Sequence, residues 1–376
     1  MIIKTENLQE ISNKILQAVD TDATTSITSN GDKIELVVVN GQLQLNVTNK
    51  EYYARVVIDN VPNEDFRATV DAKVFLNLIS KLTTETVELT TNSNMLQIKS
   101  NSSNYKLPMV ADASNNDGIL HLDEILINNV TSQFNISSDI LLSILNYNAK
   151  EIKANVVQPI QKLFYIDEKG CLTFTQGACV NSFTLNQPIK LLINHKLVKL
   201  FKLFKSGDVK FTLGYDQVND KLIQTKVKFE NDDISITAIT STDNTLLNKY
   251  PVDKIRSRAN GMFEYQTQLS KDELLQALSR LLLVNSAKGG INKDFGILDF
   301  KKDTIELWDI NKTNKEVINC TSNIQTTYSS ILDINSLKGI LETCVENDII
   351  LNSGNKQCIV LSRGNVKNVL PEVNMN

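Results

Sequence analysis

The chain contains two histidines, His121 and His195, and neither has partners at a spacing that would support chemistry. His121 lies in Leu120-His121-Leu122-Asp123, which is typical of a strand at a domain edge, and His195 opens a lysine-rich segment. A zinc site needs several His or Cys ligands, and a hydrolytic site needs a base beside a nucleophile. We therefore interpret both histidines as structural or surface residues.

The other residue types that carry chemistry are also scattered. Asp232-Asp233 and Glu64-Asp65 are adjacent carboxylates, which would face opposite ways on a strand. Lys288-Gly289-Gly290 lacks the frame of a phosphate-binding loop. The cysteines have irregular spacings that predict no metal site and indicate reduced thiols in a cytoplasm: Cys171, Cys179, Cys320, Cys344 and Cys358. We expect no catalytic residue, no metal and no cofactor, so a hydrolase is disfavoured.

One segment has a charge pattern that predicts binding rather than catalysis. Within residues 194–205 every third position is a lysine, and the intervening residues are apolar: the lysines are Lys196, Lys199, Lys202 and Lys205. Four like charges on one helix face repel one another, and a polyanion beside them would relieve that repulsion. For this segment alone, a solvated lysine face is an equally good interpretation.

The elements that position these residues recur along the chain. Residues 5–19, 135–153 and 268–284 each begin with a strand-like lead-in and a polar cap, followed by apolar residues at helical spacing. In the third copy, Ser270 and Glu273 form a capping box, which marks the start of a helix. A repeated pattern of this kind indicates several structurally similar domains.

A second pattern also occurs three times. Asp71, Asn194 and an Asp333-Ile334-Asn335 segment each follow a strand and precede a helix of about three turns. The helices near 71–82 and 335–345 are followed by hairpin patterns with turns at 92–94 and 352–355. The chain therefore predicts an α+β fold of three repeated units with two helices each, near 1–128, 129–257 and 258–376. The alternative is one large β-rich domain with accidental similarity.

The charge is distributed unevenly over this plan. The chain carries a net charge of −4, yet the six expected helices contain twelve basic and seven acidic residues; their ranges are 7–19, 71–82, 138–153, 194–205, 270–284 and 335–345. The helices are thus basic within an acidic protein. This distribution favours one electropositive surface that faces phosphates.

Taken together, these features resemble the β subunit of bacterial DNA polymerase III, a sliding clamp. The stretches that carry the resemblance are 66–100, then 262–281, and Lys249-Tyr250-Pro251. The resemblance implies a head-to-tail homodimer that forms a ring around double-stranded DNA without reading its sequence. It also implies a processivity factor, not an enzyme, which binds the replicative polymerase and the clamp loader through short peptides.

Two sets of site residues follow from this resemblance. The basic helix residues are expected to face DNA: Lys14, Lys73, Lys81, Lys150, Lys153, Lys196, Lys199, Lys202, Lys205 and Arg280. A partner-peptide pocket is expected between the second and third domains, with Arg363 at its rim: Thr175, Gly177, Val180, Pro251, Ile255, Ile359, Val360, Leu361 and Arg363. The alternative for residues 359–361 is an interior strand, and the tail from Asn365 is expected either to fold over the site or to hang free.

The chain departs from the family at this expected pocket. Thr175-Gln176-Gly177-Ala178-Cys179-Val180 stands where the family usually has Thr-Asp-Gly-His-Arg-Leu, and Leu361-Ser362-Arg363-Gly364 where a Met-Pro-Met-Arg-like stretch is usual. Such divergence would suit a phage- or plasmid-encoded clamp with altered peptide preferences. With no apolar run long enough to span a bilayer and no signal peptide, we expect a cytoplasmic protein without a membrane partner. A β-rich structural or interaction protein that does not bind DNA is the alternative function.

Overall fold

A computed structural model describes residues 1–19, 30–49, 51–151, 158–218, 221–240, 244–288 and 292–373. By its internal contacts the chain divides into two compact units. Unit 1 comprises Met1–Asp139 and Lys199–Thr242, and unit 2 comprises Ile140–Val198 and Asp243–Asn376.

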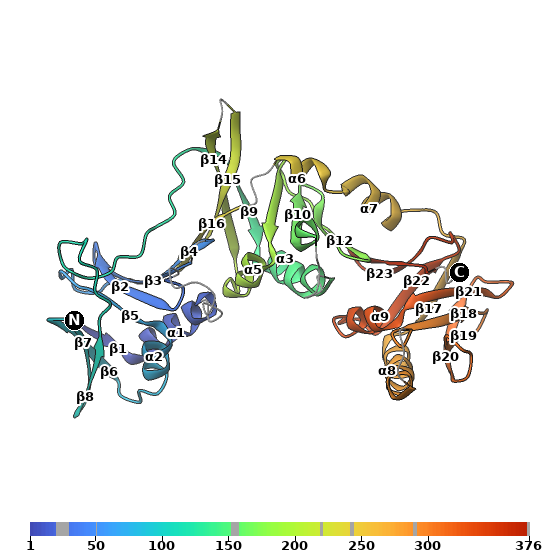
Figure 1. Ribbon diagram of the computed structural model, residues 1–376, viewed down its shortest axis with the longest axis horizontal. Helices are drawn as coiled ribbons and strands as arrows, with labels where there is room; N and C mark the ends of the chain where they lie inside the picture. Colours follow the sequence, from blue (N-terminus) through green and yellow to red (C-terminus); the bar gives the residue numbers. More distant parts are fainter. Residues whose placement is uncertain are drawn as a thin grey trace. The chain divides into compact units, whose positions relative to one another are not determined.

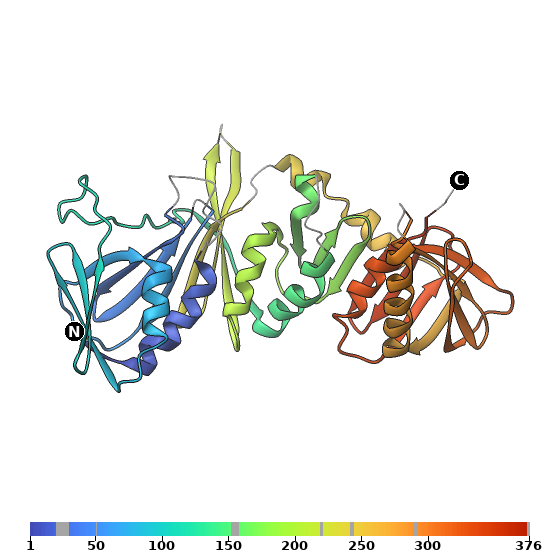
Figure 2. The same ribbon diagram turned by 60° about the horizontal axis from the view of Figure 1, so that its bottom comes forward.

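The first repeat consists of two successive β-α-β-β-β halves (Figure 1). Its elements are β1 (Ile2–Lys4), α1 (Thr5–Ile15), the 3-10 turn η1 (Leu16–Ala18), β2 (Lys33–Val39), β3 (Gln42–Thr48), β4 (Tyr52–Ile58), β5 (Arg67–Asp71), α2 (Ala72–Ile79), β6 (Thr86–Asn92), β7 (Met95–Ser100) and β8 (Ser103–Pro108). Figure 2 shows α1 and α2 side by side against the strands, where Leu8, Ile15 and Phe75 are fully buried.

The second repeat has the same order with short helices. Its elements are β9 (Val130–Ser137), α3 (Ser138–Ser143), the π-turn η3 (Ile144–Asn148), α4 (Ala149–Glu151), the 3-10 turn η4 (Pro159–Lys162), β10 (Leu163–Asp167), β11 (Gly170–Phe174), β12 (Ala178–Ser182), β13 (Lys190–Asn194), α5 (His195–Val198), the 3-10 turn η5 (Lys199–Leu203), β14 (Asp208–Val218), β15 (Lys221–Glu230) and β16 (Ile234–Ile239). Two helices then follow, α6 (Asn244–Lys249) and α7 (Val252–Ala259).

The third repeat completes the described chain. Its elements are β17 (Tyr265–Ser270), α8 (Lys271–Lys288), β18 (Phe295–Phe300), β19 (Thr304–Asp309), β20 (Lys315–Ser322), β21 (Tyr328–Asp333), α9 (Ile334–Leu341), β22 (Asp348–Ser353), β23 (Cys358–Arg363) and β24 (Val366–Pro371). Helices α8 and α9 pack together over a core that contains Phe300, Leu337 and Leu361.

The strand pairing follows one rule in all three repeats. The first strand of each half pairs with a strand of the other half: β1 with β6 and β5 with β2, then β9 with β14 and β13 with β10, then β17 with β22 and β21 with β18. This threefold exchange confirms the predicted α+β fold of three repeated units.

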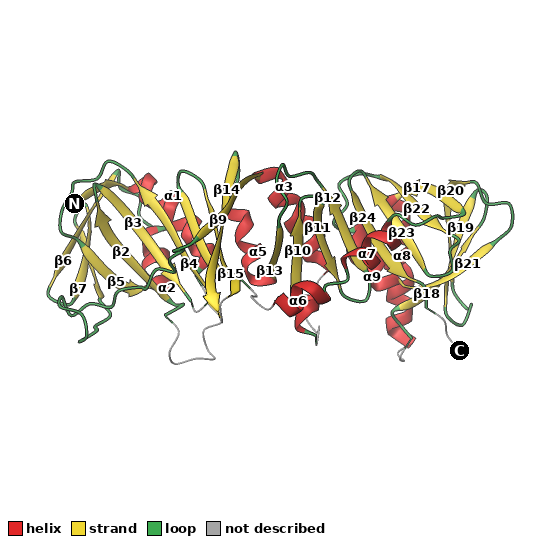
Figure 3. Ribbon diagram, turned by 90° about the horizontal axis from the view of Figure 1, so that it is seen from above, coloured by secondary structure: helices red, strands yellow, loops and turns green. Residues whose placement is uncertain are grey.

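Neighbouring repeats are joined by antiparallel pairing between the last strand of one repeat's first half and the last strand of the next repeat. In unit 1, β4 pairs with β16 within an eight-stranded sheet. In unit 2, β24 lies between β12 and β23 within a twelve-stranded sheet (Figure 3). The predicted domain limit at 128 falls just before β9, and the one at 257 falls within α7. Because the two units share the second repeat between them, these limits stay a prediction.

Three helix starts have the cap that the sequence indicates. The side chains of Asp71, Asn194 and Asp333 accept hydrogen bonds from the backbone N–H three residues later, at 2.9, 3.0 and 2.8 Å. Such caps satisfy donors that have no partner within the helix. At Ser270 the hydroxyl accepts a longer bond from the Glu273 N–H, at 3.4 Å. Asn347 additionally caps α8 by accepting from the Asp272 N–H at 3.1 Å.

Two expected helices are less regular than the sequence pattern indicates. In the segment expected as a helix over 138–153, α3 gives way to η3, and residues 152–157 lie outside the described residues. The buried Asn148 amide ends this π-turn by donating to the Cys171 and Cys179 carbonyls and to the Thr173 hydroxyl. The segment expected as a helix over 194–205 is α5 followed by η5. Three residues per turn in η5 place side chains at i and i+3 above one another.

Candidate functional site

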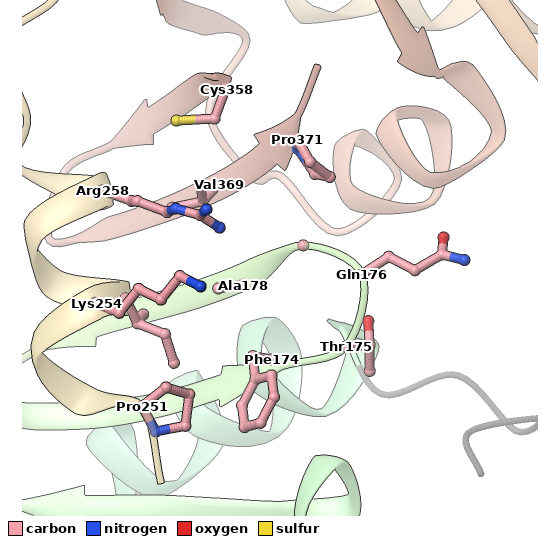
Figure 4. A pocket seen from close by; sticks show the side chains of 12 residues that line it. Phe174, Thr175, Gln176, Ala178, Pro251, Lys254, Arg258, Cys358, Val369 and Pro371 are labelled. Atoms are coloured by element: carbon pink, nitrogen blue, oxygen red, sulfur yellow. The ribbon is translucent and has the colours of Figure 1, made fainter. Parts of the chain in front are cut away.

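An apolar cavity of about 160 Å³ lies in unit 2, where β11, β12, α7 and β24 meet. Figure 4 shows Phe174 and Thr175 at the end of β11, Pro251 at the start of α7, and Val369 and Pro371 on β24. Gln176, Gly177 and Ala178 form the turn into β12, and Cys358 contributes from β23. The cavity is thus assembled from residues of the second repeat, the third repeat and the connection between them.

The wall at α7 is held by a buried tyrosine. The Tyr250 hydroxyl lies 3.1 Å from the Leu163 carbonyl oxygen and 2.9 Å from that of Leu172, and it donates its hydrogen there. Its ring stacks on Tyr165 and meets Phe174 edge to face, with centroids 5.3 and 5.1 Å apart. Burial raises the pKa of Tyr250 well above its ordinary value, so the hydroxyl remains a donor.

An ion pair fixes the other side of α7. The Arg256 guanidinium donates to both oxygens of the buried Asp167 carboxylate, at 2.8 and 2.6 Å. The hydrogen bonds to Asp167 raise the pKa of Arg256 further, although partial burial opposes this. Because Arg256 faces β10, the neighbouring Lys254, Ile255 and Arg258 are left at the cavity. Bidentate Arg–carboxylate pairs are the geometrically specific kind, so α7 is held in one orientation.

A second hollow of about 250 Å³ adjoins the first and shares Gln176, Gly177 and Pro371 with it. Its remaining walls come from α9, the β18 start and the end of the chain: Phe295, Asp333, Ser336, Ile340, Leu370 and Val373. Asp333 is occupied as the α9 cap, so the free surface of this hollow is mainly apolar. Two adjoining apolar hollows suit an extended peptide with several apolar anchors.

The structure brings four of the expected pocket residues together at the cavity: Thr175, Gly177, Pro251 and Ile255. Val180 and Val360 lie beneath it, in an apolar cluster that also contains Ile255 and Val369. Ile359 and Leu361 lie in the core of the third repeat, fully buried. Residues 359–361 thus form the interior strand β23, which was the alternative interpretation of this segment.

Arg363 does not lie at a rim. It is 5% exposed, donates to Asn368 Oδ1 and the Cys344 thiol, and covers the Tyr147 ring with 4.6 Å between guanidinium carbon and centroid. The tail does not hang free either, because residues from Val366 to Pro371 form β24, paired on both sides. Residues 374–376 lie outside the described residues.

Sequence reasoning missed several residues that line the cavity: Phe174, Gln176, Ala178, Lys254, Arg258, Cys358, Val369 and Pro371. A usable signal was present in Leu370-Pro371, which matches the Met-Pro of the family's final stretch better than Leu361-Ser362 does. Burial raises the pKa of the Cys358 thiol, and the nearby Arg258 charge acts against that shift. The thiol therefore stays protonated at neutral pH and forms part of an apolar wall.

The basic helix residues fall into two groups. Lys73, Lys81 and Lys150 are exposed, as are Lys196, Lys199, Lys202 and Lys205 around α5 and η5. Lys153 lies outside the described residues. Within the described ranges, no carboxylate forms an ion pair with Lys199, Lys202 or Lys205. These three lysines stand one 3-10 turn apart in sequence, which aligns the first two along η5 and places the third just beyond it.

Lys14 and Arg280 are instead paired with carboxylates. The Lys14 ammonium lies 2.8 Å from Glu10 and 3.2 Å from Asp233, beside a polar hollow of about 400 Å³ that Lys205 also lines. Burial lowers the pKa of Lys14, but the hydrogen bonds to Glu10 and Asp233 outweigh it and raise the pKa. Arg280 pairs with Glu316. Both cations are thus partly neutralised, whatever surface they face.

Among the described residues, no three His, Cys, Asp or Glu side chains are placed to hold a metal ion. The described helices also include none that is long and apolar enough to cross a membrane.

Three copies of this paired α+β unit in one chain define the fold of DNA sliding clamps, and the adjoining apolar hollows lie where two copies meet. More particularly, residues 1–115 match the family model described as DNA polymerase III beta subunit, N-terminal domain. The match confirms the resemblance that the sequence indicates. Among curated proteins, none matches this sequence.

Solved structures extend the likeness over the whole chain. A DNA polymerase III beta subunit from Pseudomonas aeruginosa is 13% identical with a TM-score of 0.82, and all of both chains is covered. A putative beta subunit from Eubacterium rectale is 16% identical with a TM-score of 0.79, covering 100% of this chain and 99% of its own. The subunit from Borrelia burgdorferi, solved in complex with a natural product, is 13% identical with a TM-score of 0.81 over the same shares.

Proposed function

We propose that this protein is a DNA sliding clamp, a processivity factor without a catalytic site of its own. Two chains close head to tail into a ring around double-stranded DNA and tether replication proteins to it. The observation that carries the proposal is the way the repeats join. Each described junction pairs the last strand of one repeat's first half with the last strand of the next repeat's second half, as β4–β16 and β12–β24.

This pairing rule leaves one strand edge open in the third repeat and a complementary one in the first repeat. By the same correspondence, β20 of the third repeat is the equivalent of β4 and β12, and β8 of the first repeat is the equivalent of β16 and β24. Within the described ranges β8 pairs on one side alone, with β7. Along Lys315–Asn319, β20 pairs with β19, whereas its pairing with β17 begins at Cys320. Pairing β20 of one chain with β8 of another would continue the series.

The backbone directions at these edges support the joint. Asp309 N–H donates to the Asn314 carbonyl, so alternation along the antiparallel ladder turns the backbone groups of Lys315 and Val317 outward. Met109 N–H donates to the Asn94 carbonyl, and the same alternation turns Asn104 and Lys106 outward on β8. Val317 is also 54% exposed, an apolar side chain on an open edge. Unpaired edges invite a strand from another chain.

The contacts with DNA would be electrostatic and independent of sequence. The exposed lysines in and just after α2, and those in and just after the α5–η5 segment, supply positive charge on an acidic chain. Contacts of this kind position a protein on phosphates but do not read bases. Retention then comes from closure of the ring around the duplex, and direct affinity remains weak and sensitive to salt.

The two adjoining hollows in unit 2 would receive short peptides of the replicative polymerase and of the clamp loader. The apolar walls at Phe174, Ile255 and Val369 suit anchoring side chains, which supply most of the energy in such contacts. The site of action would be the cytoplasm, where a bacterial-type replisome has access to DNA.

The proposal is tested by loading the protein onto nicked circular DNA with its clamp loader and then linearising the circle. A clamp stays on the circle through a wash at moderate salt and is released when an end is made. Release from intact circles at the same rate as from linear DNA would contradict closure around the duplex. Tight binding to one preferred sequence would contradict it as well, and lack of any association with DNA would favour a structural or interaction protein.

A further inference from the structure

We infer that the cavity selects partner segments that carry a carboxylate beside their apolar anchors. This inference rests on the proposed function, because it assumes that a peptide occupies the cavity. It goes further by assigning a charge requirement to that peptide, through Lys254 and Arg258.

Both cations belong to the cavity. Lys254 and Arg258 lie four residues apart on α7 and line the space together with Pro251 and Ile255. In Figure 4 both side chains extend from α7 across the mouth, towards the strand that carries Ala178 and the strand that carries Val369. The Arg258 charge is also close enough to act on the Cys358 thiol in the wall.

Three carboxylates around the cavity are engaged by other groups. Asp167, from β10, forms an ion pair with Arg256, the remaining basic residue of α7, on the opposite side of the helix. Glu372, which follows β24, accepts the Tyr328 hydroxyl at 2.6 and 2.8 Å. Asp333 beside the second hollow is the cap of α9. In the part of the chain that the structure describes, neither Lys254 nor Arg258 forms an ion pair within 4 Å.

Charge complementarity follows from this arrangement. Two like charges at i and i+4 on a helix repel each other, and an anion between them removes that repulsion. The adjoining surface is apolar, so a bound peptide would displace water around the cations and strengthen the attraction to its carboxylate. Arg258 can in addition hold a carboxylate with two parallel hydrogen bonds. An Asp or Glu next to the anchors is therefore favoured over Gln or Asn.

The test uses a phage-displayed library of random dodecapeptides. It is selected on the wild type, on the Lys254→Gln/Arg258→Gln double variant, and on a Lys249→Gln/Lys302→Gln control that loses the same charge from exposed positions outside the cavity lining. The half-buried Phe174 forms part of the cavity wall, and counter-selection on a Phe174→Asp variant removes the peptides that bind outside the cavity. Circular dichroism of each variant confirms that it is folded.

We expect Asp and Glu to be enriched beside apolar residues in the wild-type and control pools and not in the double-variant pool. The strongest wild-type peptide should lose roughly three- to tenfold in affinity on the double variant, and less at high salt. Equal acidic content in all three pools would overturn the inference. If the peptides depend on Phe174 but ignore Lys254 and Arg258, only the charge requirement fails. If no peptide depends on Phe174, the peptide site itself fails.

Discussion

The Arg280 guanidinium on α8 donates two hydrogen bonds to the Glu316 carboxylate on β20, at 2.9 and 2.7 Å. This pair ties a helix residue expected to face DNA to the open edge strand of the third repeat. Glu316 is hydrogen-bonded on the β19 side of the ladder, so its backbone lies between the outward-facing groups of Lys315 and Val317. The arginine therefore supports the edge as much as it adds charge.

We expect Arg280→Gln to weaken dimerisation more than it weakens retention on DNA. The hydrogen bonds from Arg280 lower the pKa of the Glu316 carboxylate, and the carboxylate charge offsets part of the positive charge of the arginine. Analytical ultracentrifugation should show a raised dimer dissociation constant, and the exchange Arg280→Glu with Glu316→Arg should restore part of it. A loss of DNA retention with an unchanged dimer would contradict this assignment.

The lysines around η5 should behave in the opposite way. The change of Lys199, Lys202 and Lys205 to Glu should impair retention on circular DNA, while each substitution alters stability by less than about 0.5 kcal/mol because the side chains are exposed. A matched control changes Lys169, Lys190 and Lys302 to Glu, which gives the same charge outside the helices. If both triple variants are retained equally, η5 does not face the duplex.

The joint between chains is tested by a single proline. Val317→Pro removes an outward N–H that a partner strand would need, and edge positions tolerate proline within their own sheet. Light scattering should show wild type at twice the 42.1 kDa chain mass and the variant at the single mass. Val317→Ala, which keeps the N–H, should stay dimeric. A dimeric proline variant with unaltered affinity would place the joint elsewhere.

Substitutions in the core and in the cavity should have different effects, the first on stability and the second on peptide binding. Leu361→Ala should lower the free energy of unfolding by about 2–5 kcal/mol because this fully buried side chain packs in the third repeat. Pro371→Ala, at the cavity, should weaken peptide binding and leave the unfolding midpoint nearly unchanged. Denaturant titration and fluorescence polarisation measure the two effects. If Leu361→Ala weakened peptide binding without lowering the free energy of unfolding, Leu361 would belong to the peptide site after all.

Tyr250 links stability to alkaline pH. Its raised pKa means that the folded state keeps a proton that the unfolded chain loses above about pH 10, so stability is complete below that pH and falls as pH rises further. Tyr250→Phe should lower the free energy of unfolding by about 1–2 kcal/mol at pH 7.5, because the Leu163 and Leu172 carbonyls lose a donor. The free energy of unfolding of Tyr250→Phe should decline less steeply from pH 9 to 11 than that of the wild type. A parallel decline in both proteins would assign the alkaline loss to other groups.

The fold could be predicted from local signals. Asp71, Asn194 and Asp333 cap their helices as the sequence indicates, because a cap depends on residues only three positions apart. The repeated order of strands and helices followed from the same short-range patterns. The π-turn at 144–148 could not be predicted, because it depends on Asn148 reaching acceptors in β11 and β12.

The candidate site was predicted in part for a related reason. Thr175, Gly177, Pro251 and Ile255 belong to two local segments, and both were identified. The opposing wall depends on which C-terminal strand reaches β12, and the sequence pattern is compatible with either β23 or β24. The structure gives that position to β24, so Val369 and Pro371 line the cavity and Leu361 is buried one strand further away.

The exchange of first strands between halves has a consequence for biosynthesis. Ile2 pairs with Glu88, and Phe134 pairs with Phe211, so the first strand of these two repeats pairs with a strand that is synthesised much later. During translation, β1 and β9 remain without a paired strand until the second half of their repeat is made, whereas β17 can first pair with β20 of its own half. Contacts so distant in sequence raise the contact order and slow folding. The ribosome-bound chain should therefore gain protease resistance in steps of one whole repeat, with no stable half-repeat between them.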